Sequence, residues 1–255
     1  MSRQIRAAIA ARFAAAEGYD AHASVQRRVA RRLAQRIAAV PLPERPTVLE
    51  IGCGTGLLGE CVLPQWPAVH WLATDLSPAM VARCRRKLGG GVVPGRVSAL
   101  AMDGSSPALA AGSIDLVCSS MAMQWFADPA GAVRHWTRLL RPGGAIAIAT
   151  LLRGSLAPWY AALAASGIAA PLPPYPDEAG VRRWFGGRCE LEIAEHQDRF
   201  DSARAFARSL KAIGAHGAPN FTAAMPTAQV RAALRRLGSG EVAIPYRVAM
   251  VIATA

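Results

Sequence analysis

The sequence predicts an α/β fold: a doubly wound, mostly parallel sheet of seven strands with N-terminal helices and a helical lid insertion. Apolar runs of strand length alternate with segments of helical spacing across residues 45–151, an order typical of parallel sheets with helices on both faces. A glycine-rich turn follows the first run, and two more strand-like runs lie near the end of the chain. We expect one domain of 255 residues, a length that ordinary α/β domains reach.

Residues 1–40 have the spacing of helices. Apolar residues fall four apart, first at Ile5, Ile9 and Phe13 and again from residue 25 to residue 37, with arginines between them. We expect two amphipathic helices that are broken near Gly18. Three prolines between residues 41 and 46 end this segment, because proline does not continue a helix.

Residues 48–56 read Val-Leu-Glu-Ile-Gly-Cys-Gly-Thr-Gly, a buried strand that enters a ligand-binding turn. Glycines are needed where the backbone takes a positive φ or passes close to a ligand. A second apolar run, at 69–74, ends in Asp75, where an acid is placed to accept ribose hydroxyls. Residues 54–59 also satisfy G-x-G-x-x-G, so this turn alone leaves both NAD and S-adenosylmethionine open.

The elements after Asp75 continue the alternation of strand and helix. A capping Ser77 and Pro78 begin a helix to about residue 88, which three glycines at 89–91 stop. A strand at 97–102 ends in Asp103, and strands at 114–119 and 145–151 flank a helix from about 128 to 140. A turn at 141–144, Arg-Pro-Gly-Gly, precedes the last of these strands.

The pattern loosens after Gly154, in the region 152–255 that we expect to form the lid and the last strands. A proline-rich run at 171–176 precedes a helix at 178–185, a strand at 190–200 and a helix at 202–213. Further helical sequence reaches residue 237, and a strand covers 246–253. Long insertions beside a binding crevice commonly select the substrate.

Composition limits the class of protein. The net charge of +12 rests on arginine, since Lys87 and Lys211 are the only lysines, and such a field attracts acidic proteins, nucleic acid or anionic membranes. No apolar stretch is long enough to span a membrane, and no secretory signal begins the chain, so we expect a cytoplasmic protein. Five cysteines without a C-x-x-C pair support neither a disulfide framework nor a metal site.

Three features favour S-adenosylmethionine over NAD: Glu50 before the first glycine, Asp103 at a third strand end, and the turn at 140–144. Together these motifs of residues 45–151 resemble the class I methyltransferases. The resemblance implies that the glycines lie beneath the amino-acid portion of S-adenosyl-L-methionine, that Asp75 holds the ribose, and that Met102 and Asp103 hold the adenine. The expected cofactor-binding residues are Glu50, Gly52, Gly54, Gly56, Asp75, Met102, Asp103 and Ser119.

Stretches outside that half resemble one branch of the superfamily, the malonyl-acyl-carrier-protein O-methyltransferases of biotin synthesis. They lie at 14–26, 119–125, 150–156, 208–215 and 245–248. The resemblance implies that the free carboxylate of a malonyl thioester, on acidic acyl carrier protein or in malonyl-CoA, accepts the methyl group. A carboxylate is ionised at neutral pH, so no catalytic base is required and orientation supplies the catalysis.

The resemblance also suggests pocket residues. Tyr19, Gln124 and Trp125 are expected at the reacting end. A cation should place the substrate carboxylate, and we expect Lys211 rather than Arg208 or Arg153 because lysine is so rare in this chain. Two sets of arginines are candidates for the carrier docking face: 27, 28, 31 and 32, or 204, 208, 235 and 236. We expect no nucleic-acid or membrane partner. Another small-molecule or RNA methyltransferase, and a cofactor-binding assembly factor without methyl transfer, remain alternatives.

Overall fold

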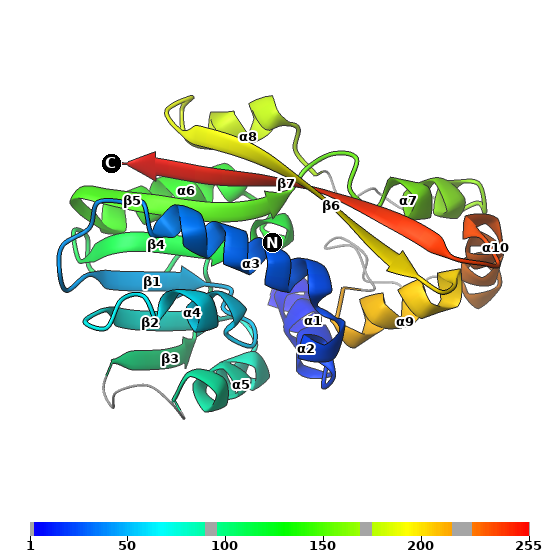
Figure 1. Cartoon of the computed structure of the whole chain (residues 1–255), viewed down its shortest axis with the longest axis horizontal. Helices are drawn as coiled ribbons and strands as arrows, with labels where there is room; N and C mark the ends of the chain where they lie inside the picture. The colour runs from blue at the N-terminus through cyan, green and yellow to red at the C-terminus, as the bar shows by residue number, and fades with distance from the viewer. Residues whose placement is uncertain (1–2, 90–95, 169–174, 216–225, 255) are drawn as a thin grey trace.

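The computed structural model describes residues 3–89, 96–168, 175–215 and 226–254. A seven-stranded sheet with the order β3-β2-β1-β4-β5-β7-β6 forms its centre (Figure 1). Strands β1 to β5 pair in parallel, whereas β7 runs antiparallel to both β5 and β6. The predicted fold class is therefore confirmed. The strands are β1 (Thr47–Ile51), β2 (His70–Asp75), β3 (Val97–Ala101), β4 (Ile114–Ser120), β5 (Leu140–Leu151), β6 (Glu190–Phe200) and β7 (Val242–Thr254).

Helices cover both faces of the sheet because side chains alternate along each strand. Val48 of β1 belongs to a core cluster with α3, α4 and α5, whereas its neighbours Leu49 and Ile51 belong to a second cluster with α6 and α8. The bounds of these helices are α3 (Ser24–Ile37), α4 (Leu57–Val62), α5 (Pro78–Gly89), α6 (Pro129–Leu139) and α8 (Glu178–Trp184).

The N-terminal segment differs from the expected two helices. It forms α1 (Arg3–Ala14), a short α2 (Tyr19–His22) and α3, so a second break at Ala23 accompanies the predicted break near Gly18. The guanidinium of Arg83 in α5 donates to the backbone carbonyls of residues 13, 14 and 16. These bonds fix the end of α1 and the residues that follow it to α5.

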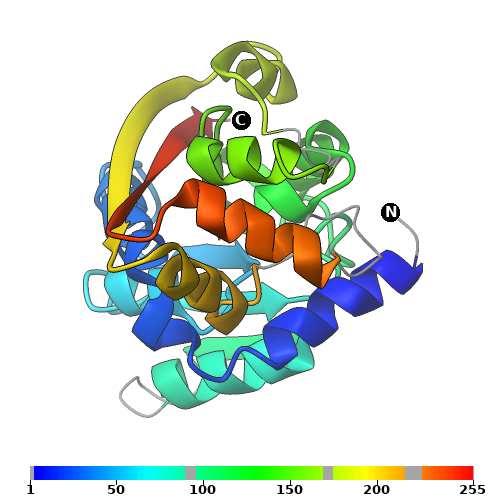
Figure 2. The same cartoon turned by 90° about the vertical axis from the view of Figure 1, so that its right-hand side faces the viewer.

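The predicted lid consists of α7 (Ala157–Ala164), α9 (Ala203–Ala212) and α10 (Thr227–Leu237), which gather at one end of the molecule (Figures 1 and 2). Helix α7 was not predicted. Helix α10 packs on both α7 and α9, whereas α8 packs on α6 and belongs to a helical layer that covers one face of the sheet. The proline-rich run at 171–174, the helical extension at 216–225 and the last two glycines of the 89–91 stop lie outside the described residues.

Two local predictions are corrected. The Ser77 hydroxyl caps nothing, since it is buried without a hydrogen-bond partner in the described structure, and the backbone N–H of Ser77 instead donates to Asp75. The predicted turn at 141–144 forms a register irregularity inside β5, which pairs Leu140 with Ile114 and Ala145 with Leu116. The parallel pairing places this turn at the opposite end of the sheet from the glycine-rich turn.

The described cysteines are all free thiols, at positions 53, 61, 84, 118 and 189. Within the ranges that the structure describes, no helix combines the length and the apolar character needed to cross a membrane. The same residues contain no group of three or more potential metal ligands.

Candidate active site

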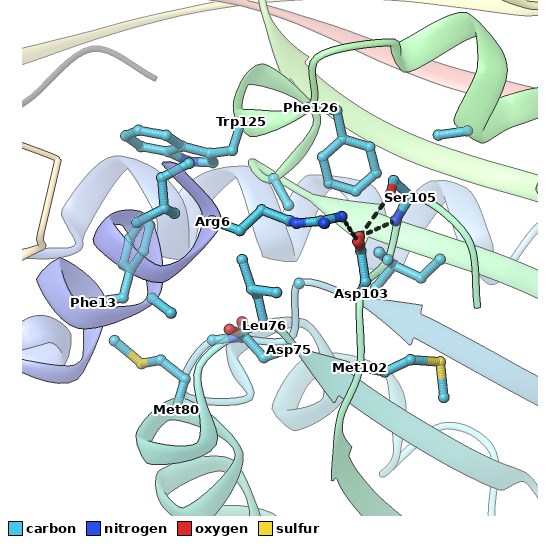
Figure 3. A pocket seen from close by; sticks show the side chains of 18 of the residues that line it. Arg6, Phe13, Asp75, Leu76, Met80, Met102, Asp103, Ser105, Trp125 and Phe126 are labelled. Atoms are coloured by element: carbon cyan, nitrogen blue, oxygen red, sulfur yellow. Dashed lines mark hydrogen bonds and ion pairs between the residues drawn. The ribbon is translucent and has the colours of Figure 1, made fainter. Parts of the chain in front are cut away.

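A pocket of about 340 Å³ lies where β1 to β4 end. Its floor includes Gly52 after β1, Asp75 of β2, Met102 after β3 and Ser120 of β4. The chain crosses from the β1-β2-β3 half of the sheet to β4 beside β1, and such switch points are the usual ligand crevices of open α/β sheets. The volume lies in the range of small-molecule sites. Helix α1 supplies the facing wall (Figure 3).

The glycines of the turn have different roles. Gly52 and Gly54 line the pocket with φ of 68° and 54°. A Cβ on Gly52 would lie 2.4 Å from the Cβ of Ala122, whereas a Cβ on Gly54 would meet nothing within 4 Å. Gly54 therefore borders open space in which a ligand fits. Gly56 faces away from the pocket: it precedes α4 in the left-handed conformation and packs on Leu88 of α5.

Asp75 is held rigidly at the end of β2. Its carboxylate accepts hydrogen bonds from the backbone N–H of Gly54 at 2.9 Å and of Ser77 at 2.8 Å. Burial raises the pKa of Asp75, and the backbone N–H donors partly offset that rise. Each oxygen of a carboxylate has two acceptor sites, so lone pairs remain for the ribose hydroxyls that we predict here.

Asp103 lies at the end of the pocket that we predict to hold adenine. Its Oδ1 accepts from the backbone and the hydroxyl of Ser105, and its Oδ2 accepts from Arg6 of α1 at 2.5 Å (Figure 3). Burial raises the pKa of Asp103, but the Ser105 and Arg6 donors outweigh it, and the pKa is lowered overall. Asp103 is therefore ionised at neutral pH.

Aromatic side chains form the wall that we predict at the reacting end. Phe13 of α1 and Trp125 after β4 meet edge to face, with ring centroids 5.3 Å apart, and both line the pocket together with Tyr19 of α2. Burial and the nearby Asp75 raise the pKa of Tyr19. The phenol stays protonated at neutral pH and serves as a donor, not as a base.

Besides Gly56, two of the predicted cofactor-binding residues do not line the pocket and lie beneath it. Glu50 is 1% exposed and accepts a hydrogen bond from the indole N–H of Trp71 at 2.9 Å. Burial, despite that bond, raises the pKa of Glu50 to about 8. The hydroxyl of Ser119 donates to the carbonyl of Ile51 in the core of the sheet. Both residues support the strand ends from below.

Gln124 also lies outside the pocket lining and supports a strained loop. Its amide N–H donates to the carbonyl of Met121 at 2.6 Å, and Met121 has a φ of 58° without being a glycine. Such a conformation persists only where neighbours fix it, and it is common at functional sites. Met121 and Trp125 line the pocket on either side of this bond.

The structure does not bring the predicted carboxylate-binding cations to the pocket. Lys211 and Arg208 lie on the exposed side of α9, and Arg153 is exposed near Asp177, 3.6 Å away. Among the described residues that line the pocket, Arg6 alone has a basic side chain. The rarity of lysine in the chain therefore did not indicate a place in the pocket.

An ion-pair network fixes the N-terminal helices to the glycine-rich turn. The carboxylate of Asp20 accepts hydrogen bonds from the hydroxyl of Thr55 in that turn and from the ammonium of Lys87 in α5. Burial raises the pKa of Asp20, but Lys87 and Thr55 outweigh it, and the pKa is lowered. The turn and the pocket wall from α1 and α2 are thus mechanically joined.

Several residues that line the pocket were not predicted from the sequence. The apolar stripe with Ile9 and Phe13 was recognised, but periodicity does not tell a face that covers a core from one that covers a pocket. No sequence signal marked Arg6 or Ser105. The pocket residues not predicted as site residues include Arg6, Ile9, Phe13, Leu76, Met80, Ser105, Phe126 and Asp128.

The acceptor groups of the pocket fit the hydroxyl and amino donors of S-adenosylmethionine. Carboxylates stand at the ends of two neighbouring strands, at Asp75 and just after β3 at Asp103, and the open side of Gly54 borders the same pocket. This site on this fold defines an S-adenosylmethionine-dependent methyltransferase. Accordingly, residues 48–144 match the family described as a methyltransferase domain.

Comparison with known proteins narrows the class. The chain is 42% identical to the biotin biosynthesis bifunctional protein BioCD of Bordetella avium, over 94% of this chain and 51% of that protein, so it spans about half of that relative's length. It is 41% identical to the malonyl-[acyl-carrier protein] O-methyltransferase of Magnetococcus marinus, over 80% of this chain and 75% of the relative. The chain belongs to the family of malonyl-[acyl-carrier protein] O-methyltransferases.

Solved structures support the fold independently. The YcgJ protein of Bacillus subtilis superposes with a TM-score of 0.63, covering 87% of this chain and 97% of that one. The two sequences share 14% identity, so this likeness concerns the fold alone.

Proposed function

We propose that this protein methylates the free carboxylate of a malonyl thioester borne by acyl carrier protein, giving a methyl ester for biotin synthesis. When bound, S-adenosylmethionine supplies an electrophilic methyl group on sulfur. A carboxylate oxygen of the acceptor forms the new bond to carbon, the carbon–sulfur bond breaks, and its electron pair stays on the sulfur of S-adenosylhomocysteine. No proton is transferred in this step.

The observation that carries the proposal is the lack of a free general base among the described residues that line the pocket. They include no histidine, lysine or cysteine. Asp75 and Asp103 stand where we predict the ribose and the adenine, so bound cofactor would take the acceptor sites that the backbone N–H groups, Ser105 and Arg6 leave free. Asp128 accepts from the backbone N–H of Gly131 at the start of α6. An acceptor that had to lose a proton would lack a partner here, whereas an ionised carboxylate needs none.

The chain's own contribution to catalysis is then orientation and the exclusion of water. The aromatic wall of Phe13, Tyr19 and Trp125 surrounds the predicted reacting end. A protonated Tyr19 offers an O–H donor there. Fixed alignment of two reactants contributes as much as roughly 7–11 kcal/mol to a displacement of this kind.

The carrier protein and the compartment are also part of the proposal. Relatives named for malonyl-[acyl-carrier protein] share 31–41% identity with most of this chain, and an excess of basic residues suits an acidic carrier. Free thiols at all five described cysteines suit a reducing compartment, and we propose the cytoplasm.

Methyl transfer to defined thioesters tests the proposal. The protein is incubated with S-adenosylmethionine labelled in the methyl group and with carrier protein loaded with malonyl, succinyl or acetyl groups. We expect a base-labile methyl ester on the malonyl carrier and no label on the acetyl carrier, which lacks a free carboxylate. Label in RNA, or no transfer to any thioester, would overturn the proposal.

A further inference from the structure

We propose that the exposed faces of α9 and α10 form the surface on which the acidic carrier protein docks. This inference rests on the proposed function, since it concerns the delivery of the same substrate. We call the surface the α9–α10 face. Its members are Arg204, Arg208 and Lys211 of α9 and Arg231, Arg235 and Arg236 of α10.

The charge of this region has a single sign. Residues 202–240 contain these six basic side chains and not one Asp or Glu, so the segment carries +6 of the chain's formal +12. All six residues are exposed. None of them forms an ion pair within the described structure, and the sequence of residues 216–225 contains no acid to neutralise them.

The six side chains lie on the outer sides of the two helices. On α9, positions 204, 208 and 211 are spaced to share one side, and the opposite side buries Ala203, Phe206 and Leu210. On α10, positions 231 and 235 are one turn apart, and Ala233 is buried. The helices pack on each other, and Figure 2 shows them side by side at the end of the molecule that faces the viewer.

Most arginines on the alternative face, on α3, are bound to other residues of the protein. Arg28 pairs with Asp198, Arg32 with Glu192, and Arg36 with both Glu190 and Glu192 of β6. Arg27 donates to the backbone carbonyl of Asp20. Ion pairs of this kind cancel the field that would steer an acidic partner. On α3, Arg28 and Arg32 use their charge in ion pairs and Arg31 stays exposed without one in the described structure, whereas on the α9–α10 face all six basic residues lack an ion pair. The larger unpaired charge favours the α9–α10 face as the docking surface.

Helix α9 also connects this face to the pocket. The segment after α9 turns at Gly214, whose Cα lies so close to α1 that a Cβ there would be 3.1 Å from the carbonyl of Arg12 and from the ring of Phe13. Phe13 in turn packs on Trp125, and both line the pocket. Helix α9 has ten residues and is about 15 Å long. A carrier on the basic side of this helix is therefore about that far or less from the contact at Gly214, and it presents its flexible arm near the aromatic end of the pocket.

Charge reversal on both helices tests the inference. The test variant is Arg204→Glu with Arg235→Glu, one substitution on each helix. The control is Arg183→Glu with Arg188→Glu, two exposed arginines in and after α8, which belongs to the layer beyond the sheet. Both variants change the net charge equally. Initial rates are measured with malonyl carrier protein and with malonyl pantetheine, which has the reacting group and arm but no protein.

We expect the test variant to lower kcat/KM for the carrier-bound substrate by about tenfold or more, mainly through KM, and the control to lower it by about twofold at most. Rates with malonyl pantetheine should be the same for the parent, test and control proteins. Added salt should slow the parent on carrier substrate more than it slows the test variant, since screening removes the same attraction.

The experiment distinguishes failure of the proposed docking surface from failure of the proposed methyl transfer. No methyl ester from either thioester would overturn the proposed function. Methylation of both thioesters, with equal losses in the test and control variants on carrier substrate, would overturn the docking surface alone. Loss of RNA binding in the test variant, with carrier kinetics unchanged, would assign the face to nucleic acid and would likewise overturn the inference.

Discussion

Arg6 reaches across the pocket from α1, and its Nη1 lies 2.5 Å from Oδ2 of Asp103 (Figure 3). The two residues are 97 positions apart in the chain. Asp103 is the acid at which we predict the adenine to bind, so the ion pair and the cofactor compete for one carboxylate. The other end of α1 is fixed by Arg83, which leaves the Arg6 end as the part that yields to a ligand.

Replacement of Arg6 should therefore tighten cofactor binding. Both side chains of the pair are 37% exposed, and exposed pairs contribute about 0.2–1 kcal/mol, so we expect Arg6→Ala to raise the affinity for S-adenosylhomocysteine by up to about fivefold. Isothermal titration calorimetry measures this change. Arg3→Ala, an exposed arginine on the same helix, is the control and should leave the affinity unchanged. Weaker binding by Arg6→Ala would show that Arg6 contacts the cofactor.

Asp75 should be required for cofactor affinity, and not only for the thermal stability of the protein. Asp75→Asn removes the charge, and hydrogen bonds to charged groups contribute about 1.5–3 kcal/mol, so the affinity for S-adenosylhomocysteine should fall about 10- to 100-fold. Asp177→Asn is the matched control, because Asp177 accepts a backbone N–H at the start of α8 away from the pocket. Thermal melts should show lower stability for both variants. Equal affinity in the two would refute the ribose assignment.

The sequence pointed to the residues of the pocket floor because strand ends are local features. An apolar run that ends in glycine or acid places Gly52, Asp75 and Asp103 at one edge of a parallel sheet, wherever the remaining helices lie. The facing wall depends on how α1 folds back onto α5, through bonds from Arg83 to three carbonyls. Neither the spacing nor the composition of α1 encodes that contact, and Arg6 was missed for this reason.

Tertiary packing also explains why the predicted carboxylate-binding cations do not line the pocket. Lys211 was preferred because it is one of two lysines, which is a property of composition and not of position. The helical spacing of α9 places Phe206 and Leu210 in the core and leaves Lys211 exposed. The other lysine, Lys87, binds Asp20 and joins α5 to α2.

Alanine substitutions at Gly54 and Gly186 form a matched pair. Together they distinguish a methyl group that blocks the cofactor from one that only strains the backbone. Both have a positive φ, 54° and 61°, and a Cβ on either would meet nothing within 4 Å. Substitution of each by alanine should cost about 1–2 kcal/mol of unfolding free energy, from the left-handed conformation alone. Only Gly54→Ala places its methyl group in the pocket, so only that variant should lose affinity for S-adenosylhomocysteine. An unchanged affinity would mean that the cofactor does not pass over Gly54.

Glu50 should make the stability of the protein depend on pH. Its pKa is raised by burial to about 8 in the folded state, against about 4.3 in an unfolded chain. Between these values the native state holds a proton that the unfolded state has lost, so the contribution of Glu50 to the unfolding free energy falls as the pH rises from about 5 to 8. Glu50→Gln keeps an acceptor for the indole N–H of Trp71 but does not ionise.

Urea unfolding of the parent and of Glu50→Gln at pH 5, 6, 7 and 8 measures this contribution. Other titrating groups affect both proteins alike, so the difference between them isolates residue 50. The parent should lose stability relative to the variant with each step toward pH 8, by about 1 kcal/mol or more in total, since one pKa unit corresponds to about 1.4 kcal/mol. Parallel curves for the two proteins would mean that the carboxyl of Glu50 is already ionised at pH 5, and that burial beneath the glycine-rich turn does not keep it neutral.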